Sequence, residues 1–525
     1  MSDQSDALNK LARDRGIIPD IPPELEYLRA PRRGEQLISF SKKVGEILNM
    51  NGLYRRGATP VTIDPETGHV EAMQPDRFRS YLERHIVPYV KRRGEHDDES
   101  VLVPVVISSS EAKACLDCDE FRYPLRKLSR VNFVRLPVMR ADGRIELLPK
   151  GYDPTSQILT TMDCLDYPTD WTLESAVRFL RLFFEEFPFI DERSLAVQIC
   201  AMLTVYGADL LPLGAKRLNF AYRANRPRAG KGLLMSVAIV GPCGPFAQIQ
   251  AIPDDKHELK KLLDTEALNG SRYVILDEVR NQLRDSTLNA FLTATIWTGR
   301  LFHSQRKFAV PQTSVLFIAG NNINLSADLA GRFLLVDLHV EEADAQRRKI
   351  NHQIDEVHLA RPDVRSDLLA ATWALLSAWE KAGRPCASSV YRGFEWFSNI
   401  FGGIVENAGF GNPFTSSERH TDLEFDQMSA LIEHLAAGVR SKREFKFHQI
   451  IEACRQLGAF EARTSRSARH ETGEAQLRPA DKSWFGKLLG DRYGATSFTL
   501  RDGRRARFDK RSFNRSRRYV LEIMS

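Results

Sequence analysis

Between Leu218 and Val340 the sequence alternates between short apolar runs and helical patterns, and this alternation restricts the possible folds more than any other feature. Apolar runs of strand length that alternate with helical patterns predict βαβ units, which build a parallel sheet covered by helices. Strands that are buried on both faces read as near-continuous hydrophobic runs. We therefore expect an α/β domain with a parallel sheet in this part of the chain.

The first apolar run leads into a loop that contains Gly-Lys. Residues 218–222 predict a buried strand, residues 223–232 read RANRPRAGKG, and a helical stretch follows. A strand, a glycine-containing loop and a helix in this order are typical of a phosphate-binding P-loop. Backbone N–H groups at the helix start would bind phosphate oxygens, and the lysine would reach the β and γ oxygens of ATP. The expected nucleotide-binding residues of this loop are Asn225, Ala229, Gly230, Lys231 and Gly232.

Two positions of this loop depart from the P-loop pattern GxxxxGK[ST]. Asn225 replaces the first glycine, and asparagine tolerates left-handed backbone better than most residues. Gly232 replaces the hydroxyl residue that normally contacts Mg²⁺. Water would substitute for this hydroxyl, because Mg²⁺ usually keeps several waters. An active ATPase, a slow one and an ATP-binding remnant therefore all stay open, and the other motifs favour activity.

The next apolar run ends in two acidic residues. Residues 271–278 read SRYVILDE, which predicts a strand with Asp277 and Glu278 at its carboxyl end. In a P-loop ATPase, Asp277 would hold Mg²⁺ through water, and Glu278 would polarise the attacking water. Acids also occur at the solvated ends of ordinary strands, so this pair indicates catalysis only together with the P-loop.

Two further signals follow in the order that a P-loop ATPase requires. Residues 314–322, SVLFIAGNN, predict a strand that ends in Asn321 and Asn322, whose amides can orient water beside the γ-phosphate. In residues 328–333, DLAGRF, Arg332 precedes the last predicted strand. An arginine in this position can reach the γ-phosphate bound by a neighbouring subunit. Four strand-end signals in this order predict an ATPase rather than unrelated surface groups.

The segments NRPRAGKG, YVILDE, FIAGNN and DLAGRF together resemble the superfamily 3 or D5-like AAA+ helicases of phages, plasmids and integrated elements. The resemblance covers most of the chain, although only these motor motifs are specific. It implies an AAA+ core with a helical lid, ATP and Mg²⁺ as ligands, and a ring, commonly a hexamer. It also implies a basic hairpin before the sensor strand that contacts single-stranded DNA. Arg306 and Lys307 occupy the hairpin positions, although charged hairpin tips are common in any protein.

The residues before the motor predict a small α+β domain. It would include a hairpin turn at 65–68, a helix over 76–93 and a turn at 141–143. Amphipathic helices follow, and Thr172 is placed to cap the first of them. The aromatic cluster FLRLFFEEFPF, residues 179–189, is expected to form core rather than a base-stacking platform.

The last residues of the chain concentrate basic side chains. Residues 501–518 read RDGRRARFDKRSFNRSRR, which is an electrostatic footprint for a phosphate backbone. A helix over 445–454, a second helix over 482–489 and the flanking strands predict a winged helix that docks on duplex DNA. The alternative is a packing domain whose basic wing faces solvent. The residues expected to contact DNA here are Lys487, Arg504, Arg505 and Arg507.

Composition excludes several other classes of protein. The chain has 525 residues, of which 43% are hydrophobic and 27% charged, as in soluble proteins with several domains. No apolar run approaches the roughly 20 residues that cross a bilayer, so no membrane partner is expected. Seven cysteines without repeated spacing argue against a disulfide framework and favour the cytoplasm.

We therefore expect a DNA-dependent ATPase, namely a helicase or translocase of a mobile genetic element that unwinds DNA during replication. Its partners would be single- and double-stranded DNA, further copies of the chain, and a primase or other replication proteins. A replication initiator without processive unwinding and a non-catalytic DNA-binding protein stay open as alternatives. The expected parts are an N-terminal α+β domain (1–170), an AAA+ core with leading helices (171–344), a helical lid (345–414) and a winged-helix domain (415–525).

Overall fold

The computed structural model describes most of the chain, and its elements mix helices and strands as expected for an α/β protein. Two compact units are present: Met1–Arg280, Asp285–Ile323 and Arg332–Thr415 form unit 1, and Asn281–Arg284, Asn324–Gly331 and Ser416–Ser525 form unit 2. The described residues are 25–31, 35–64, 70–93, 100–224, 228–253, 255–277, 279, 282–283, 285–300, 307–321, 323–340, 354–415, 423–460, 467–468, 476–477, 479–489, 497–500, 502–513 and 516–524.

The N-terminal part of unit 1 packs short helices against small sheets. Gly45 in one helix lies so close to the next helix that an added Cβ would stand 2.3 Å from the Phe121 carbonyl oxygen. The two helices therefore touch only because residue 45 has no side chain. The elements are β1 (Glu26–Arg29), α2 (Ile38–Met50), β2 (Tyr54–Arg56), β3 (Thr59–Ile63), β4 (Val70–Ala72), α3 (Pro75–Glu83), β5 (Ile86–Arg93), β6 (Ser100–Pro104), α4 (Ser109–Asp117), α5 (Asp119–Arg122), β7 (Arg126–Lys127), β8 (Arg130–Val134), β9 (Pro137–Met139), β10 (Ile145–Leu147), β11 (Gly151–Asp153) and β12 (Ile158–Leu165).

The predicted turn at 141–143 joins paired strands, whereas the predicted helix over 76–93 is wrong in its second half. The predicted turn at 65–68 lies outside the described residues. β3 pairs antiparallel with β4, and β9 pairs antiparallel with β10 around Gly143, whose φ is +84°. The helix α3 ends at Glu83, and Ile86–Arg93 forms β5 between β1 and β6. Pro88 cannot donate a helical hydrogen bond, and its β-branched and aromatic neighbours favour a strand.

The centre of unit 1 is the predicted parallel sheet. Its five strands run in the order β14-β15-β19-β13-β21, and all neighbours are parallel. The apolar runs that predicted strands therefore form the sheet, as expected. The strands are β13 (Asn219–Ala224), β14 (Ile249–Ala251), β15 (Tyr273–Asp277), β19 (Val315–Asn321) and β21 (Phe333–Leu338).

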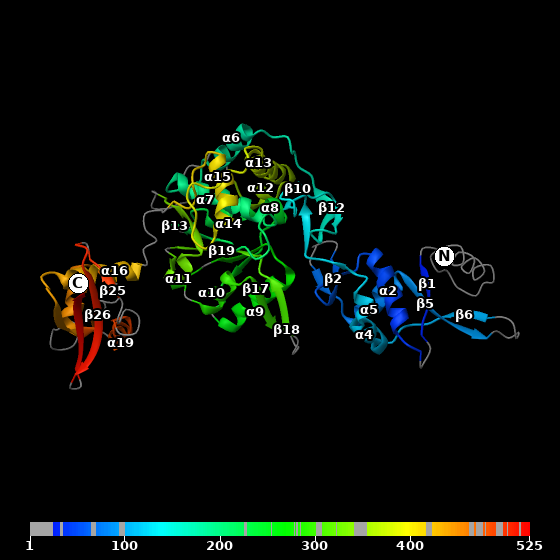
Figure 1. Ribbon diagram of the computed structural model, residues 1–525, viewed down its shortest axis with the longest axis horizontal. Coiled ribbons are helices and arrows are strands. Elements are labelled where there is room, and N and C mark those ends of the chain that lie inside the picture. Colours follow the sequence, from blue (N-terminus) through cyan, green and yellow to red (C-terminus); the bar gives the residue numbers. More distant parts are fainter. Residues whose placement is uncertain are drawn as a thin grey trace. The chain divides into compact units, whose positions relative to one another are not determined.

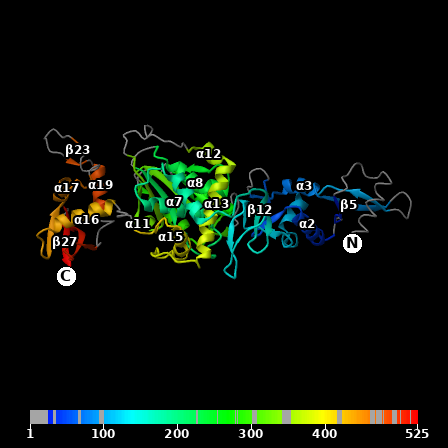
Figure 2. The ribbon, with the colours of Figure 1, turned by 90° about the horizontal axis from the view of Figure 1, so that it is seen from above.

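Helices from three parts of the sequence gather on one side of these strands (Figures 1 and 2). The helix α6 (Leu173–Phe184) is capped by Thr172, as predicted, because its side chain accepts a hydrogen bond from the backbone N–H of Ser175. Buried Gln198 of α7 (Glu192–Tyr206) accepts a bond from Tyr222 of β13 and donates one to the carbonyl of Leu234. Further helices are α8 (Lys231–Cys243), α12 (Glu356–Ala360), α13 (Pro362–Lys381), α14 (Glu395–Phe397), the π-helix η2 (Ser398–Gly402) and α15 (Gly403–Asn407).

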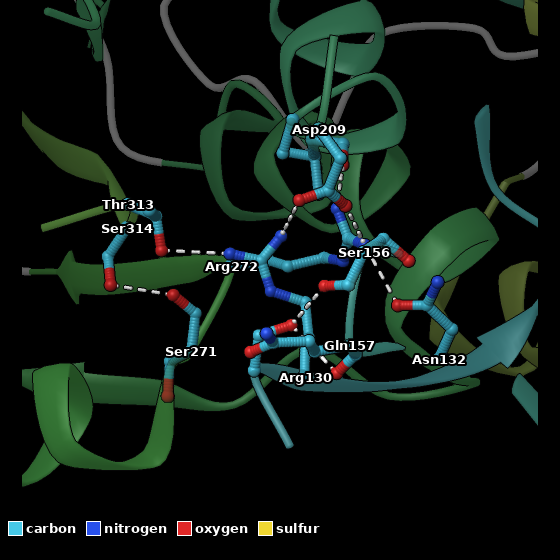
Figure 3. Close-up of polar contacts among 12 residues, drawn as sticks. Arg130, Asn132, Ser156, Gln157, Asp209, Ser271, Arg272, Thr313 and Ser314 are labelled. Atoms are coloured by element: carbon cyan, nitrogen blue, oxygen red, sulfur yellow. Dashed lines mark hydrogen bonds and ion pairs between the residues drawn. The ribbon is translucent and has the colours of Figure 1, made fainter. Parts of the chain in front are cut away.

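A buried ion network joins β8 to the amino edge of the sheet (Figure 3). Arg130 of β8 donates to one oxygen of Asp209 at 2.8 Å, and Arg272, which directly precedes β15, donates to the other at 2.7 Å. Arg130 also bonds Thr313, and Arg272 bonds Asn132. The two arginine side chains are only 9% and 6% exposed. Burial would raise the pKa of Asp209, but Arg130 and Arg272 outweigh it and lower that pKa to about 2.

Unit 2 combines helices with an antiparallel sheet in the order β22-β27-β26-β25. The helix predicted over 445–454 begins only at Phe447, because Phe445 and Lys446 pair with β27. The rings of Phe508 and Tyr519 stack at 5.8 Å inside this unit. The winged-helix assignment stays a prediction. The main elements are α16 (Leu423–Ala436), β22 (Lys442–Lys446), α17 (Phe447–Gln456), α19 (Pro479–Lys487), β25 (Ser497–Thr499), β26 (Arg505–Phe513) and β27 (Ser516–Met524).

Among the residues that the structure describes, no helix has both the length and the apolar character needed to cross a membrane.

Replacing Asp209 by alanine should destabilise the protein by about 3–5 kcal/mol, because two buried guanidinium groups lose their shared carboxylate. Urea unfolding at neutral pH measures this loss. The matched control is Asp166→Ala, because Asp166 pairs with Lys150 but is 69% exposed, and exposed pairs contribute little. Equal effects of the two substitutions would show that the Asp209 network does not stabilise the fold.

The same carboxylate makes stability depend on acid pH in a defined direction. The folded-state pKa of Asp209 is lowered from 3.8 to about 2, so its contribution is present above about pH 4 and lost as the pH falls towards 2. Asp209→Ala should therefore lose less stability than the wild type between these pH values.

Candidate nucleotide-binding site

The described end of the loop between β13 and α8, residues 228–230, has the left-handed glycine that a phosphate-binding turn requires. The strand ends at Ala224 and the helix begins at Lys231, directly after Gly230 in a left-handed conformation with φ +94°. This glycine is the N-cap residue of α8 and has no side chain to cap the helix. The first backbone N–H groups of α8 can therefore donate to a bound anion. Ala229 is buried beside it, and Asn225 lies outside the described residues.

The carboxyl edge of the sheet brings the predicted lysine and aspartate together. Asp277 is the last residue of β15, and Leu276, the residue before it, pairs with Ile318 of β19. Burial lowers the pKa of half-buried Lys231, and the charge of Asp277 opposes this shift. The two side chains therefore interact electrostatically at the start of α8.

Of the predicted amides and the predicted base, only the backbone of Asn321 lies within the described residues. The backbone of Asn321 ends β19 and pairs with Ala224, the last residue of β13. The side chain of Asn321 and the whole of Glu278 and Asn322 lie outside the described residues.

Gly320 is a positioning residue that sequence reasoning missed. A Cβ at this position would stand 2.4 Å from the carbonyl oxygen of Val279 and 2.8 Å from a side-chain carbon of Ile323. The backbone N–H of Val279 donates to the carbonyl of Ala319 at 3.0 Å, so the chain that follows Asp277 runs along β19. Only glycine at position 320 allows this approach, and the glycine in AGNN was the available signal.

Phe187 is a second residue whose position was not foreseen. Its ring lies 3.4 Å from where a Cβ of Gly230 would be, so it borders the phosphate-binding turn. The carbonyl of Pro188 accepts a hydrogen bond from His339, which fixes this segment beside the end of β21. The expectation that the aromatic cluster forms core holds for buried Phe184, whereas Phe187 is only partly buried.

Arg332 lies at the opposite edge of the sheet from Lys231. Its carbonyl accepts a hydrogen bond from the backbone N–H of Asn219, the first residue of β13, and its guanidinium bonds Asn289 of α10 (Ser286–Thr293). The P-loop follows the other end of β13, which has six residues and so spans roughly 20 Å. Within one chain Arg332 is therefore too far to touch a nucleotide bound at Lys231.

The predicted basic hairpin is formed by β17 (Ile296–Arg300) and β18 (Lys307–Pro311). The two strands pair antiparallel, and exposed Lys307 stands opposite exposed Arg300 at the end next to the turn. Residues 301–306, including Arg306, lie outside the described residues.

The DNA-binding candidates of unit 2 differ in how accessible they are. Lys487 at the end of α19 and Arg505 at the start of β26 are exposed, whereas Arg507 is half-buried. Arg504 is exposed, but its guanidinium bonds Asp502 and the carbonyl of Val439. Of the three arginines, Arg505 is thus the best placed for a phosphate contact.

Comparisons with known proteins return similarity only at the level of solved structures. No family model matches the chain, and no curated protein matches it. Two structures of the NrS-1 C-terminal region (CTR) align over 92% of this chain and 99% of theirs at 10% identity, with TM-scores of 0.33 and 0.36. A structure of the active helicase Cch of SCCmec type IV aligns over 81% of this chain and 95% of its own, at 10% identity and a TM-score of 0.30. At this level of similarity, the function has to be argued from the residues of the site.

Gly232→Ser should lower the Mg²⁺ concentration needed for ATP binding, because the hydroxyl adds an oxygen ligand beside Lys231. An ideal Cβ at residue 232 meets no atom within 4 Å, so the variant should fold normally. Titration with a fluorescent ATP analogue at increasing Mg²⁺ measures the effect.

Gly230→Ser is the matched control, because the left-handed backbone opposes any side chain there. It should weaken nucleotide binding at every Mg²⁺ concentration. An unchanged Mg²⁺ dependence in Gly232→Ser would place residue 232 away from the metal.

Proposed function

We propose that this chain is an ATP hydrolase of the AAA+ P-loop class that works as a DNA helicase or translocase of a mobile genetic element. The observation that carries the proposal is the meeting of a left-handed Gly230, Lys231 and Asp277 at the carboxyl edge of a parallel sheet. The order of the four motifs and their resemblance to superfamily 3 or D5-like helicases support the same class. The proposal includes the four parts 1–170, 171–344, 345–414 and 415–525, a ring of subunits, commonly six, and a cytoplasmic site of action.

The residues present fit a magnesium nucleotide. Lys231 is half-buried and within electrostatic range of Asp277, so a cation and a carboxylate already oppose each other where phosphates and metal would lie. Gly232 leaves open space beside them, which water ligands of the metal can fill. Mg²⁺ held by Asp277 through water would supply positive charge that neutralises the phosphate oxygens.

Each remaining residue of the site then has a separate task. The N–H groups of α8 and the ammonium of Lys231 bind phosphate oxygens. Glu278 accepts the proton of the attacking water, and the amide of Asn321 or Asn322 orients that water. Phe187, which borders Gly230, excludes solvent from one side of the phosphates.

Arg332 would complete the site of a neighbouring subunit. Its place at the amino edge of the sheet puts it too far from Lys231 of its own chain, so we assign it to the adjacent subunit's nucleotide. An arginine supplied in trans stabilises charge that develops on the transferred phosphate. Hydrolysis would then depend on assembly.

The DNA contacts we propose lie on two basic elements. Lys307 and Arg306 of the hairpin would contact single-stranded DNA, and Lys487, Arg504, Arg505 and Arg507 of unit 2 would contact duplex DNA through backbone phosphates. A primase or other replication proteins would act beside such a motor. One observation favours a second candidate: Gly232 lacks the usual metal-binding hydroxyl, which suits a replication initiator that assembles with ATP and turns it over slowly.

Glu278→Gln should reduce ATP hydrolysis by roughly 100-fold or more while ATP binding persists, because only the general base is lost. Lys231→Ala should abolish both, because the phosphates lose their cation. Steady-state hydrolysis with Mg²⁺, with and without oligo(dT), measures turnover, and Glu258→Gln, at an exposed position of α9 (Lys256–Asn269), is the charge-matched control. Wild-type turnover that oligo(dT) stimulates supports a motor. Unaltered turnover in Lys231→Ala would show that the site lies elsewhere.

Mixing Arg332→Ala with Lys231→Ala should restore part of the hydrolysis that each variant lacks alone. In a mixed ring, the intact P-loop of one variant meets the intact arginine of the other, so complete sites form again. Hydrolysis of the mixture, compared with each variant at the same total concentration, measures this rescue. A mixture without activity, although both variants still assemble, would contradict a role for Arg332 in the neighbouring site.

A further inference from the structure

One buried indole fixes the base of the β17–β18 hairpin on α9 (Lys256–Asn269). Trp297 of β17 is 7% exposed, and its Nε1–H donates to a carboxylate oxygen of Asp264 at 2.6 Å. The other side of the ring meets Phe291 of α10 edge-on at 5.0 Å. The indole is thus held between two helices, and Asp264 provides its polar contact.

A lysine of the same helix completes the contact. Lys260 Nζ bonds both oxygens of Asp264 at 2.9 and 3.0 Å and lies 5.0 Å from the centre of the Trp297 ring. The carboxylate therefore accepts two charge-assisted bonds and one indole bond, while the ammonium also interacts with the ring face. Three side chains determine how the hairpin sits on α9.

Close packing of the hairpin on Asp264 depends on Gly299. A Cβ at this position would stand 2.4 Å from the ring of Phe308, which is its partner across the hairpin, and 2.8 Å from an oxygen of Asp264. A larger residue would have to displace the ring or the carboxylate. The hairpin therefore lies directly against the helix, and a change in its tilt must disturb the carboxylate.

The hairpin and α9, which meet at this contact, are each followed in the chain by a strand that ends at the candidate ATP site. The strand β18 continues through residues 312–314 into β19, which ends at Asn321. The helix α9 continues through Gly270 into β15, which ends at Asp277. Ser314 donates to the carbonyl of Ser271 at 2.6 Å, so the two strands are also tied together at their starts.

We propose that Asp264 is a positioning residue that couples DNA on the hairpin to hydrolysis at the carboxyl edge of the sheet. The inference rests on the proposed function and deepens it. A strand of DNA that pulls on the hairpin at Lys307 turns the base of the hairpin against α9, and the bonds of Asp264 transmit that turn to α9, which leads into β15. Without the bonds of Asp264 the hairpin still binds DNA, but a change in its tilt no longer moves α9.

The test compares oligo(dT)-stimulated ATP hydrolysis of the full chain in the wild type and two variants. Asp264→Asn keeps an oxygen for the indole but loses the charge that holds Lys260, and Trp297→Phe keeps a ring but loses the donor. We expect stimulation at saturating oligo(dT) to fall by about tenfold in Trp297→Phe, the factor that one bond to a charged group can carry, and by less in Asp264→Asn. The oligo(dT) concentration at half-stimulation and the turnover without DNA should both stay within about twofold of the wild type. The reason is that Lys307 of the hairpin and the residues of the nucleotide site are unchanged.

Glu258→Gln is the control, because it removes a carboxylate of α9 that is 59% exposed and pairs only with Lys261 among the described ion pairs. It should leave stimulation unchanged. Full stimulation in both variants, with a stimulated wild type, would overturn the coupling role and leave the proposed function standing. A wild type that hydrolyses ATP without any response to oligo(dT) would overturn both. A parallel loss of turnover without DNA would show that Asp264 and Trp297 only support the fold.

Discussion

The shared carboxylate of Asp209 is the contact on which the arrangement of unit 1 depends most. Arg130 of β8, in the N-terminal part, donates to this carboxylate, and so does Arg272, which directly precedes β15. Buried guanidinium groups are tolerated only where a carboxylate and further acceptors satisfy them. Separating the two segments would therefore cost much free energy. The start of β15 is therefore fixed from the N-terminal side, while its other end carries Asp277. A strand anchored at its amino end is a suitable support for the Mg²⁺-holding role that we propose for Asp277.

Parallel strands give the sheet two chemically different edges, and the polar residues that we assign to ATP hydrolysis are divided between them. The carboxyl edge holds Lys231 and Asp277, and the amino edge holds Arg332 and Arg272. A single chain thus has the lysine that we propose binds phosphates and the arginine that would complete the site on opposite edges of one sheet. In the ring that we propose, the amino edge of one subunit has to meet the carboxyl edge of the next. This requirement makes the topology itself a reason why hydrolysis would need assembly.

The sequence was sufficient for four of the five sheet strands because these are near-continuous apolar runs, whereas the edge strand β14 is short and partly exposed and no apolar run marks it. It was insufficient where helix and strand patterns compete, as at Ile86–Arg93, where Pro88 breaks a stretch that otherwise reads as an amphipathic helix. The Asp209 network was beyond prediction, because its arginines are 79 and 63 residues away and no local pattern marks buried partners. The lysine and the aspartate of the site were predictable from motif order, whereas Phe187 was not, because its role depends on a contact with Gly230.

Polar contacts of the kind that Asp264 makes differ physically from the apolar packing around them. An apolar contact keeps most of its energy when two surfaces slide by a fraction of an ångström, whereas a hydrogen bond weakens steeply once its angle departs from linearity. The bond between Trp297 and Asp264, backed by Lys260, therefore fixes an orientation rather than a mere proximity. The Phe291 contact alone would hold the hairpin on its helices but would let it rock. The role that we propose for the hairpin, to report the position of a DNA strand, needs this orientation to be fixed. A half-buried, ion-paired carboxylate at the base of the hairpin provides it, at the cost of one glycine, Gly299, in the strand.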